Sequence, residues 1–265
     1  MSLPTVSETI TTHVEAQTPL LENVIHLEDV SVRYRVPSER IGTFKEYIIR
    51  RLKRQVQMRV FWAIKDIDVD VFRGEVFGIV GDNGAGKSTL LKVVARVLRP
   101  TKGRVVVSGK VAPLLELGAG FHPELTGKEN VFLNGSLLGF SHREMQEKYS
   151  QIVDFSELGE FINAPIRTYS TGMIARLGFA VATARDTEVL IVDEILGVGD
   201  ETFQKKCEAR INEYRQRGTS ILLVSHSMTT IEKMCQRAAW LDHGVLKLVG
   251  KPSEVIRAYR EKEHS

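Results

Sequence analysis

The chain contains little cysteine and little tryptophan, with two residues of each among its 265. Cys207 and Cys235 match no metal-binding or disulfide spacing, which excludes a disulfide framework and suits a reducing cytosol. No apolar run approaches the length of a transmembrane helix. Any role at a membrane is therefore expected to come through a partner.

The sequence also has little excess of either charge, because 36 basic residues face 33 acidic ones and leave a net charge of +3. Such a balance does not indicate a nucleic-acid partner. The first 22 residues contain no lysine or arginine, unlike a secretory signal. We expect a flexible lead-in over residues 1–22 and one large domain over residues 23–265.

A glycine-rich turn is present between an apolar run and a helical pattern. The turn, residues 81–89, reads Gly-Asp-Asn-Gly-Ala-Gly-Lys-Ser-Thr, and the run at 76–80 predicts a buried parallel strand before it. A helical pattern follows over 90–98, so the context is that of a phosphate-binding loop. The predicted nucleotide-binding residues of the turn are Gly81, Asn83, Gly84, Ala85, Gly86, Lys87, Ser88 and Thr89.

The residue types of this turn suit a triphosphate with its metal ion. Gly84 and Gly86 let backbone N–H groups curl around the phosphates where a Cβ would obstruct. The start of the following helix adds free N–H groups and a positive dipole end. Lys87 supplies a mobile charge for the β- and γ-phosphates, and Ser88 offers a hydroxyl to Mg²⁺.

Polar groups at two further strand ends extend the predicted chemistry. The apolar strand predicted over 188–194 ends in Asp193 and Glu194, although buried strands do not prefer adjacent acids. Beside a phosphate-binding loop, Asp193 would hold Mg²⁺ and Glu194 would polarise the attacking water. His226, after the strand predicted over 220–225, would reach a γ-phosphate. The alternatives are a polar strand end and a structural histidine.

A second anion-binding turn is predicted at 169–173, where Tyr-Ser-Thr-Gly-Met opens a helix from 174 to about 184. Taken alone, this pattern is more often a simple N-cap. Tyr34 ends the alternating segment 30–34, where an aromatic ring would stack on adenine; the alternative is an edge-strand tyrosine.

The remaining patterns predict strands around the loop and an inserted group of helices. Alternation predicts further strands at 24–27, 61–64, 67–71 and 104–107, with a closing hairpin over 238–248. From about 112 to 184 the pattern is that of an inserted helical subdomain, with capping boxes at 126–129 and 141–144. A final helix is predicted over 253–263.

The stretch from about 37 to 60 is basic. Phe44, Ile48 and Leu52 fall four residues apart, which predicts a short basic amphipathic helix. Its cations are Arg40, Lys45, Arg50, Arg51, Lys53, Arg54 and Arg59, against only Glu39 and Glu46. One interpretation is an arm near an anionic membrane leaflet or on a membrane partner. The other is a solvated surface helix.

The order of these motifs resembles the nucleotide-binding subunit of an ABC transporter, over about residues 24–259. The resemblance implies an α/β fold: a P-loop NTPase (RecA-like) core with an antiparallel β subdomain and an inserted α-helical subdomain. It implies ATP and Mg²⁺ as cofactors. It also implies a head-to-tail dimer of two copies that sandwiches two ATP molecules.

The resemblance assigns a role to each motif. Residues 81–88 match the Walker A loop, Asp193 the Walker B aspartate, Glu194 the catalytic glutamate and His226 the switch histidine. Ser170, Thr171 and Gly172 match the signature motif, which binds the γ-phosphate held by the other copy, and Asp200 lies in the D-loop. Tyr34 falls at the adenine-stacking position, with Trp62 as a rival because of the long insert between them.

Two departures from the usual family pattern resemble one branch, the exporters of O-antigens and wall teichoic acids. Thr171 and Met173 replace a glycine and a glutamine of the usual signature, and Glu116 is the nearest polar substitute for the missing Q-loop glutamine, which makes it a candidate metal ligand. The basic insert and the segment 115–127 are also similar to that branch. Some members add a C-terminal carbohydrate-binding domain, which we do not expect within this sequence.

We therefore expect an ATPase at the cytoplasmic face of the inner or plasma membrane, docked on a separate transmembrane permease and driving export of a lipid-linked polysaccharide. The alternatives are an ABC ATPase for a smaller substrate and a non-transport ABC ATPase.

Overall fold

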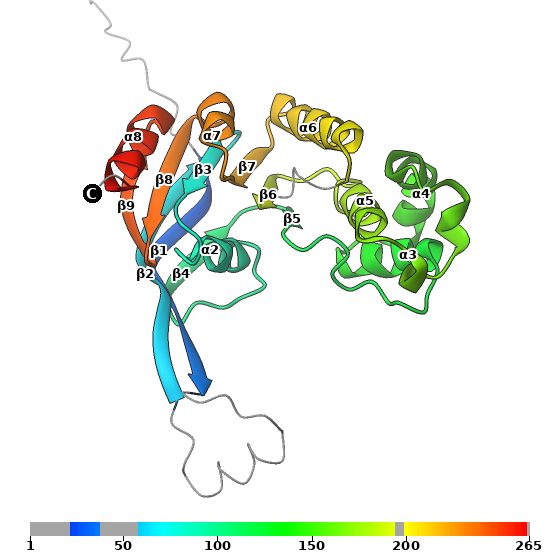
Figure 1. Cartoon of the computed structure of the whole chain (residues 1–265), viewed down its shortest axis with the longest axis horizontal. Coiled ribbons are helices and arrows are strands. Elements are labelled where there is room, and N and C mark those ends of the chain that lie inside the picture. The colour runs from blue at the N-terminus through cyan, green and yellow to red at the C-terminus, as the bar shows by residue number, and fades with distance from the viewer. Residues whose placement is uncertain (1–21, 38–57, 194–198, 264–265) are drawn as a thin grey trace, which may run out of the picture.

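The computed structural model describes residues 22–37, 58–193 and 199–263. Its centre is a six-stranded sheet in the order β5-β6-β7-β3-β8-β9 (Figure 1). Five neighbouring strands are parallel, and β9 pairs antiparallel with β8, as the predicted closing hairpin requires. The strands are β3 (Val76–Val80), β5 (Val111–Leu114), β6 (Val189–Asp193), β7 (Ser220–Val224), β8 (Arg237–Asp242) and β9 (Val245–Gly250).

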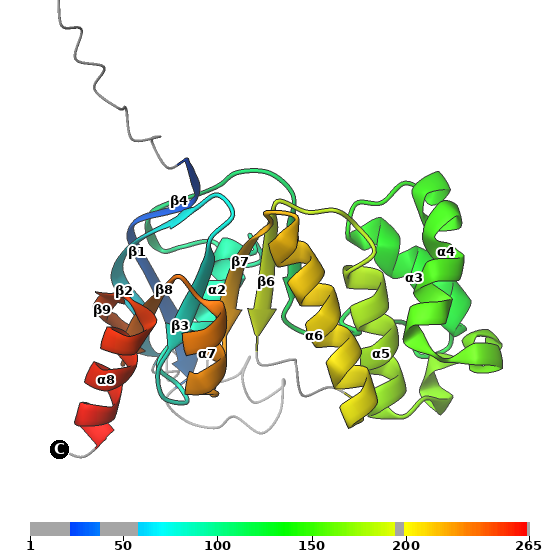
Figure 2. The same cartoon turned by 90° about the horizontal axis from the view of Figure 1, so that it is seen from above.

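The central strands are apolar throughout because both faces of the sheet are covered. In β3, Phe77 and Ile79 belong to one core and Val76 and Val80 to the other. The first core lies between the sheet, α2 (Lys87–Val94) and the second sheet. The other core is closed by the helices that Figure 2 shows side by side, α6 (Glu201–Gln216), α7 (Met228–Met234) and α8 (Pro252–Glu263). This burial holds the loop after β3 between two packed layers.

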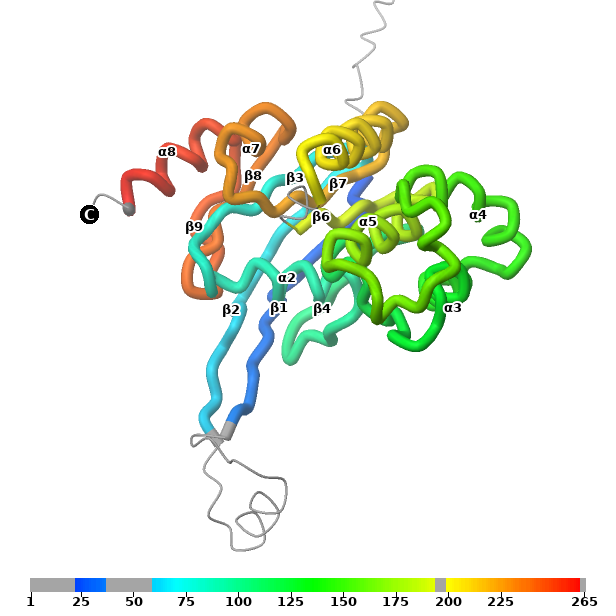
Figure 3. Tube along the Cα trace, turned by 45° about the vertical axis from the view of Figure 1, so that its right-hand side comes forward, coloured from blue at the N-terminus to red at the C-terminus, as the bar shows by residue number. Residues whose placement is uncertain are grey.

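The second sheet has three antiparallel strands in the order β2-β1-β4: β1 (Asn23–Pro37), β2 (Met58–Phe72) and β4 (Lys102–Val107). The four segments predicted as strands, 24–27, 30–34, 61–64 and 67–71, are confirmed as strand, but they form two long strands instead of four short ones. Asp29 and Asp66 adopt φ angles of 51° and 48°, and the pairing shifts register near both. These bulges interrupt the alternation but not the strands. Figure 3 shows β1 and β2 running together beyond the body of the molecule. Residues 38–57 of the predicted basic stretch, with the helix expected there, lie outside the described residues, whereas its last residues, from Met58, belong to β2.

The helical subdomain consists of α3 (Gly127–Leu137), α4 (His142–Ser156), α5 (Thr171–Ala182) and two 3-10 turns, Gly159–Asn163 and Ile166–Thr168. Thr126 and Ser141 each complete the predicted capping box. The range predicted for this subdomain, about 112–184, begins with residues of β5, which pairs with β6 in the central sheet. The helices therefore start after that strand. Within the three described segments, no helix combines the length and the apolar character needed to cross a bilayer.

Candidate functional site: a nucleotide cavity and a second hollow

A cavity of about 720 Å³ lies where the carboxyl end of β3 meets the start of α2. The residues that line it are Tyr34, Phe61, Trp62, Ala63, Asn83, Gly84, Gly86, Lys87, Ser88, Thr89, Asp193 and His243. The structure thus brings the predicted loop, the predicted strand-end aspartate and both candidate aromatic residues to one place. The edge of a parallel sheet at its carboxyl ends is the usual position of a ligand site in such folds.

The loop follows a path that only glycine allows at two positions. A Cβ on Gly81 would lie 2.1 Å from the carbonyl oxygen of Leu241, and one on Gly86 would lie 2.5 Å from that of Ala63. Gly84 meets nothing within 4 Å, but its φ of +81° is strained for other residues. Gly86 begins α2 without a side-chain cap, so the first N–H groups of the helix suit an anionic ligand.

The side chain of Lys87 is buried inside the loop. Its Nζ donates hydrogen bonds to the carbonyl oxygens of Gly81 at 2.7 Å and Asp82 at 3.0 Å. The N–H of Ala85 also donates to the Asp82 carbonyl, at 3.1 Å. The ammonium group thus satisfies carbonyls that curl around it and holds the loop in a closed turn.

Oxygen donors on the same cavity suit a hard divalent cation. The hydroxyls of Ser88 and Thr89 come from the start of α2, and the half-buried carboxylate of Asp193 comes from the end of β6. Hydroxyl and carboxylate oxygens next to a phosphate cradle are the donor set that Mg²⁺ takes together with phosphate. Glu194, the predicted general base, falls in 194–198, outside the described residues.

An aromatic wall closes another side of the cavity. Tyr34 and Phe61 pair across β1 and β2 with ring centroids 5.5 Å apart, and the Arg33 guanidinium lies 5.8 Å from the Trp62 ring. Both rival adenine-stacking residues therefore line the cavity. Phe61 and His243 also line the cavity and were not predicted from the sequence. Phe61 directly precedes Trp62 and was a findable candidate, whereas His243 lies in the β8–β9 turn, far from every motif.

Glu116 and His226 are not among the residues that line this cavity. The role of Glu116 as a metal ligand stays a prediction. Its carboxylate is 65% exposed and pairs with Lys92 at 2.9 Å, and this hydrogen bond raises the pKa of Lys92. His226 is exposed just after the carboxyl end of β7, on the same edge of the sheet as Asp193.

A second hollow, of about 560 Å³, contains the predicted signature residues Ser170 and Gly172 together with Asp200. The Ser170 hydroxyl accepts from the N–H of Met173 at 3.2 Å and begins α5, whose first residue is the exposed Thr171. The Asp200 carboxylate accepts from the N–H of Phe203 at 2.9 Å and begins α6. Two helix N-termini therefore border one hollow, whose lining also contains the carboxylates of Glu157 and Asp200 and the guanidinium of Arg176.

Arg176, which the sequence analysis did not single out, joins the elements around this hollow. Its guanidinium pairs with Glu157 at 2.9 Å and with Asp200, and it lies 4.8 Å from the Phe203 ring. The pKa of Asp200 is lowered by the backbone N–H of Phe203 and also by Arg176. Arg176 is the one charged residue within α5, and that isolation was an available signal.

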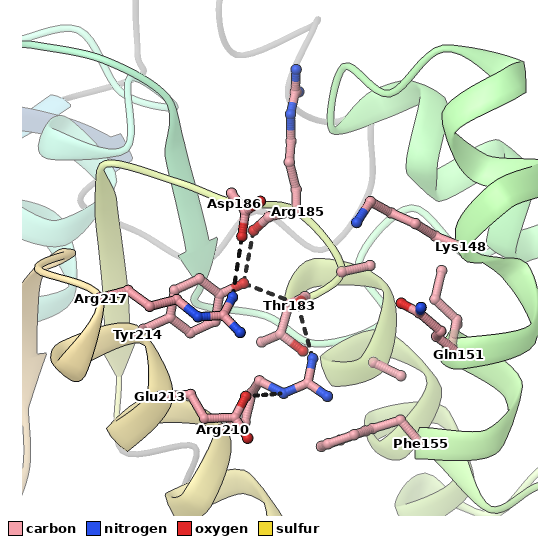
Figure 4. A pocket seen from close by; sticks show the side chains of 13 residues that line it. Lys148, Gln151, Phe155, Thr183, Arg185, Asp186, Arg210, Glu213, Tyr214 and Arg217 are labelled. Carbon is pink, nitrogen blue, oxygen red and sulfur yellow. Dashed lines mark hydrogen bonds and ion pairs between the residues drawn. The ribbon is translucent and has the colours of Figure 1, made fainter.

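Figure 4 shows a third cavity, of about 200 Å³, between α4, α5 and α6. Arg210 pairs with Glu213, Arg217 pairs with Asp186, and the Tyr214 hydroxyl donates to two backbone carbonyls. Burial raises the pKa of Tyr214 to about 12. These polar groups already have partners, so the cavity is a seam between helices. Cys207 and Cys235 are buried, with thiol pKa values raised to about 12, as expected for core residues.

Comparison with known proteins identifies the family. The ABC transporter family model matches residues 64–197. The O-antigen export system ATP-binding protein RfbB of Klebsiella pneumoniae is 45% identical over 244 residues, which cover 91% of this chain and 99% of that protein. The teichoic acids export ATP-binding protein TagH of Listeria innocua serovar 6a is 38% identical over 210 residues, covering 79% of this chain and 62% of that protein.

The fold also matches solved structures. A dimeric ATP-binding cassette in a post-hydrolysis state, bound to ADP and Pi, superposes with a TM-score of 0.67 at 20% identity, covering 86% of this chain and 98% of that one. The α/β core, the antiparallel sheet and the helical subdomain are those predicted for a P-loop NTPase. With the family match across its loop and strand-end motifs and a relative that it covers almost completely, the chain belongs to the ABC transporter family.

Proposed function

We propose that this chain is the ATP-hydrolysing subunit of an exporter that moves a lipid-linked polysaccharide of the O-antigen or teichoic-acid type across the cytoplasmic membrane. The relatives named for O-antigen and teichoic acid export support the substrate class. The observation that carries the ATPase assignment is the convergence of the glycine loop, Ser88 and Asp193 on one cavity.

The predicted site residues would have separate roles in binding and hydrolysing ATP. Lys87 would leave the loop carbonyls for the β- and γ-phosphates, and Ser88 and Asp193 would hold the cation. A bound Mg²⁺ would supply neutralisation of the phosphate charge. Glu194 would polarise the attacking water, and His226 would contact the γ-phosphate from the neighbouring strand end.

A second copy of the chain would complete the site. The nucleotide cavity and the hollow around Ser170 share no lining residue, so one chain presents a phosphate cradle and a separate pair of helix N-termini. In a head-to-tail dimer, Ser170, Thr171 and Gly172 of one copy would meet the γ-phosphate on the other. ATP would favour closure because it contacts both copies in the closed state alone.

The projecting end of β1 and β2 is where we place the membrane partner. Val36 and Val60 are 41% and 47% exposed there, next to Arg35 and Arg59. The same hairpin leads into the basic stretch 37–60. Exposed apolar groups among cations suit a membrane-bound permease and its anionic lipid surroundings, so we propose a peripheral position on the cytoplasmic side.

Glu194→Gln tests the proposed engine, because it keeps the shape of the side chain and removes the carboxylate. We expect ATP hydrolysis to stop and a stable ATP-bound dimer to appear in size-exclusion chromatography. Lys87→Ala is the control and should lose ATP binding and dimer together. Near-normal turnover in Glu194→Gln would reject Glu194 as the base, and a monomer that binds ATP would reject the sandwich.

The export assignment needs a separate measurement. In cells lacking the gene, we expect the polysaccharide to remain on the cytoplasmic side of the membrane. Expression of the wild-type chain should return the polysaccharide to the cell surface, and expression of Glu194→Gln should not. Unchanged surface polysaccharide in the deletion strain would contradict the proposed substrate class.

A further inference from the structure

The C-terminal helix α8 reaches the phosphate-binding loop through one carboxylate. The Asp82 side chain, in the second position of the loop, accepts a hydrogen bond from the Tyr259 hydroxyl at 2.7 Å. Its other oxygen accepts from Lys262 Nζ, also at 2.7 Å. Both donors come from α8, and they follow Asp82 by 177 and 180 residues in the sequence.

The donors are held in place by the core. Val255 and Ile256 anchor α8 in the core that it shares with β3 and β8. The buried Tyr259 ring packs edge-on against Trp240, with ring centroids 6.1 Å apart. Lys262 also donates to the largely buried carboxylate of Asp242, at 2.7 Å. The core therefore fixes the positions of the two donors relative to Asp82.

Asp82 also connects α8 to Lys87, the lysine of the loop. Its backbone carbonyl accepts from Lys87 Nζ and from the N–H of Ala85. Its side chain is not among those that line the nucleotide cavity and is bonded to α8 instead. Asp82 thus accepts hydrogen bonds from α8 with its carboxylate and from Lys87 with its backbone carbonyl.

We propose that Tyr259 and Lys262 are positioning residues for the nucleotide-binding loop. By holding and neutralising the Asp82 carboxylate, they keep the loop in its phosphate-binding shape when Lys87 turns from the loop carbonyls to the phosphates. They also offset the repulsion between this carboxylate and a polyphosphate. The inference rests on the proposed function, since it concerns the same ATP site.

The charge states agree with this arrangement. The hydrogen bonds from Lys262 and Tyr259 lower the pKa of Asp82, and those to Asp242 and Asp82 raise the pKa of Lys262. Both groups therefore stay charged near neutral pH. Because the Asp82 and Lys262 side chains are partly exposed, solvent weakens the pair, and we expect effects of about fivefold rather than a complete loss of binding.

The test compares ATP affinity and turnover in variants of the full chain. Lys262→Met should raise the KM for ATP about fivefold with kcat little changed. Tyr259→Phe should also raise KM. Lys262→Arg, which keeps the positive charge, should leave KM at the wild-type value. The matched control is Arg257→Met, which removes an exposed cation of α8 that has no ion-pair partner among the described residues, and which should leave KM unchanged.

A double-mutant cycle separates positioning from direct contact. In an Asp82→Asn background, Lys262→Met should cause no further rise in KM. An equal rise in both backgrounds would overturn the inference, because Lys262 would then act on the nucleotide or on a partner. A wild-type KM in both Lys262→Met and Tyr259→Phe would overturn it too.

Thermal unfolding of each variant guards against a purely structural effect. A drop in Tm that accounts for the loss of ATP binding, with unchanged KM in the folded fraction, would contradict positioning. Failure of the wild-type chain itself to bind ATP would refute the proposed function, and this inference with it, whereas normal wild-type binding with unaffected variants refutes the inference alone.

Discussion

Gly81 and Gly84 belong to one loop but are required for different physical reasons. An alanine at 81 would place its Cβ 2.1 Å from a backbone carbonyl that cannot move without shifting β8. An alanine at 84 would meet open space and bear only the cost of its positive φ. We expect Gly81→Ala to lower the free energy of unfolding by about 3 kcal/mol or more, and Gly84→Ala by about 1 kcal/mol.

Urea denaturation of the two variants measures this difference. Equal losses would show that the close contact at Gly81 relaxes freely. ATP binding is a second readout, since Gly84→Ala should weaken binding through loop shape while the fold persists.

The aromatic wall gives a second pair to compare. Tyr34 packs on the core and on Phe61, whereas Trp62 is 42% exposed beside the cavity and has more ring surface available. We expect Trp62→Ala to weaken ATP binding about tenfold, through lost base stacking, and Tyr34→Ala to weaken it less. Inorganic triphosphate, which has no base, is the control ligand and should bind both variants as it binds the wild type. The reverse order would assign the stacking to Tyr34.

Single residues were predictable where chemistry dictates sequence. A glycine loop, a lysine and a strand-end aspartate are unusual enough to be found without a structure, and they share one cavity. Phe61 and Arg176 contribute through three-dimensional packing and ion pairing, which leave weak traces in sequence. Glu116 stays a predicted metal ligand, and its ion pair with Lys92 is a contact that no local pattern reveals.

Among the helices, α4 and α5 both begin with a serine cap, and Ser141 also forms a capping box with Glu144. The hydroxyls of Ser141 and Ser170 each accept a backbone N–H three residues later, at 3.2 Å. We expect Ser141→Ala and Ser170→Ala to cost about 1 kcal/mol each in unfolding free energy. Only Ser170→Ala should also reduce ATP-dependent dimer formation, because only this cap borders the proposed γ-phosphate site.

Chemical denaturation and size-exclusion chromatography with ATP give the two measurements. Matching losses of stability and unaltered dimer formation in both variants would reduce Ser170 to an ordinary cap.

Helices and strands were predicted correctly where a local sequence pattern marks the point at which they begin or turn. Both capping boxes and the closing hairpin were found because their signals are local. The strands were predicted to break near Asp29 and Asp66, because aspartate is common in turns. In the structure both residues adopt a positive φ within bulges that do not end the strands. The short helix α7 was missed because its seven residues span barely two helical turns.

For the molecule as a whole, the basic stretch supplies a test of membrane recruitment. We expect charge reversal at Arg50, Arg51 and Arg54 to reduce co-purification with the membrane fraction several-fold at low salt, because cations near an anionic surface each add attraction. ATP binding should stay unchanged, since the substitutions leave the phosphate-binding loop and Asp193 intact. Reversal of the exposed Lys205, on α6, is the matched control. Unchanged recruitment would identify the stretch as solvated surface.

The hairpin of β1 and β2 has a mechanical implication. Tyr34, Phe61 and Trp62 stand at the cavity on the same two strands whose far ends continue into the basic stretch. A partner bound at that far end would therefore act on the position of the aromatic wall at the nucleotide cavity. Under the proposed function, binding of the permease and binding of the nucleotide would be coupled directly through these two strands.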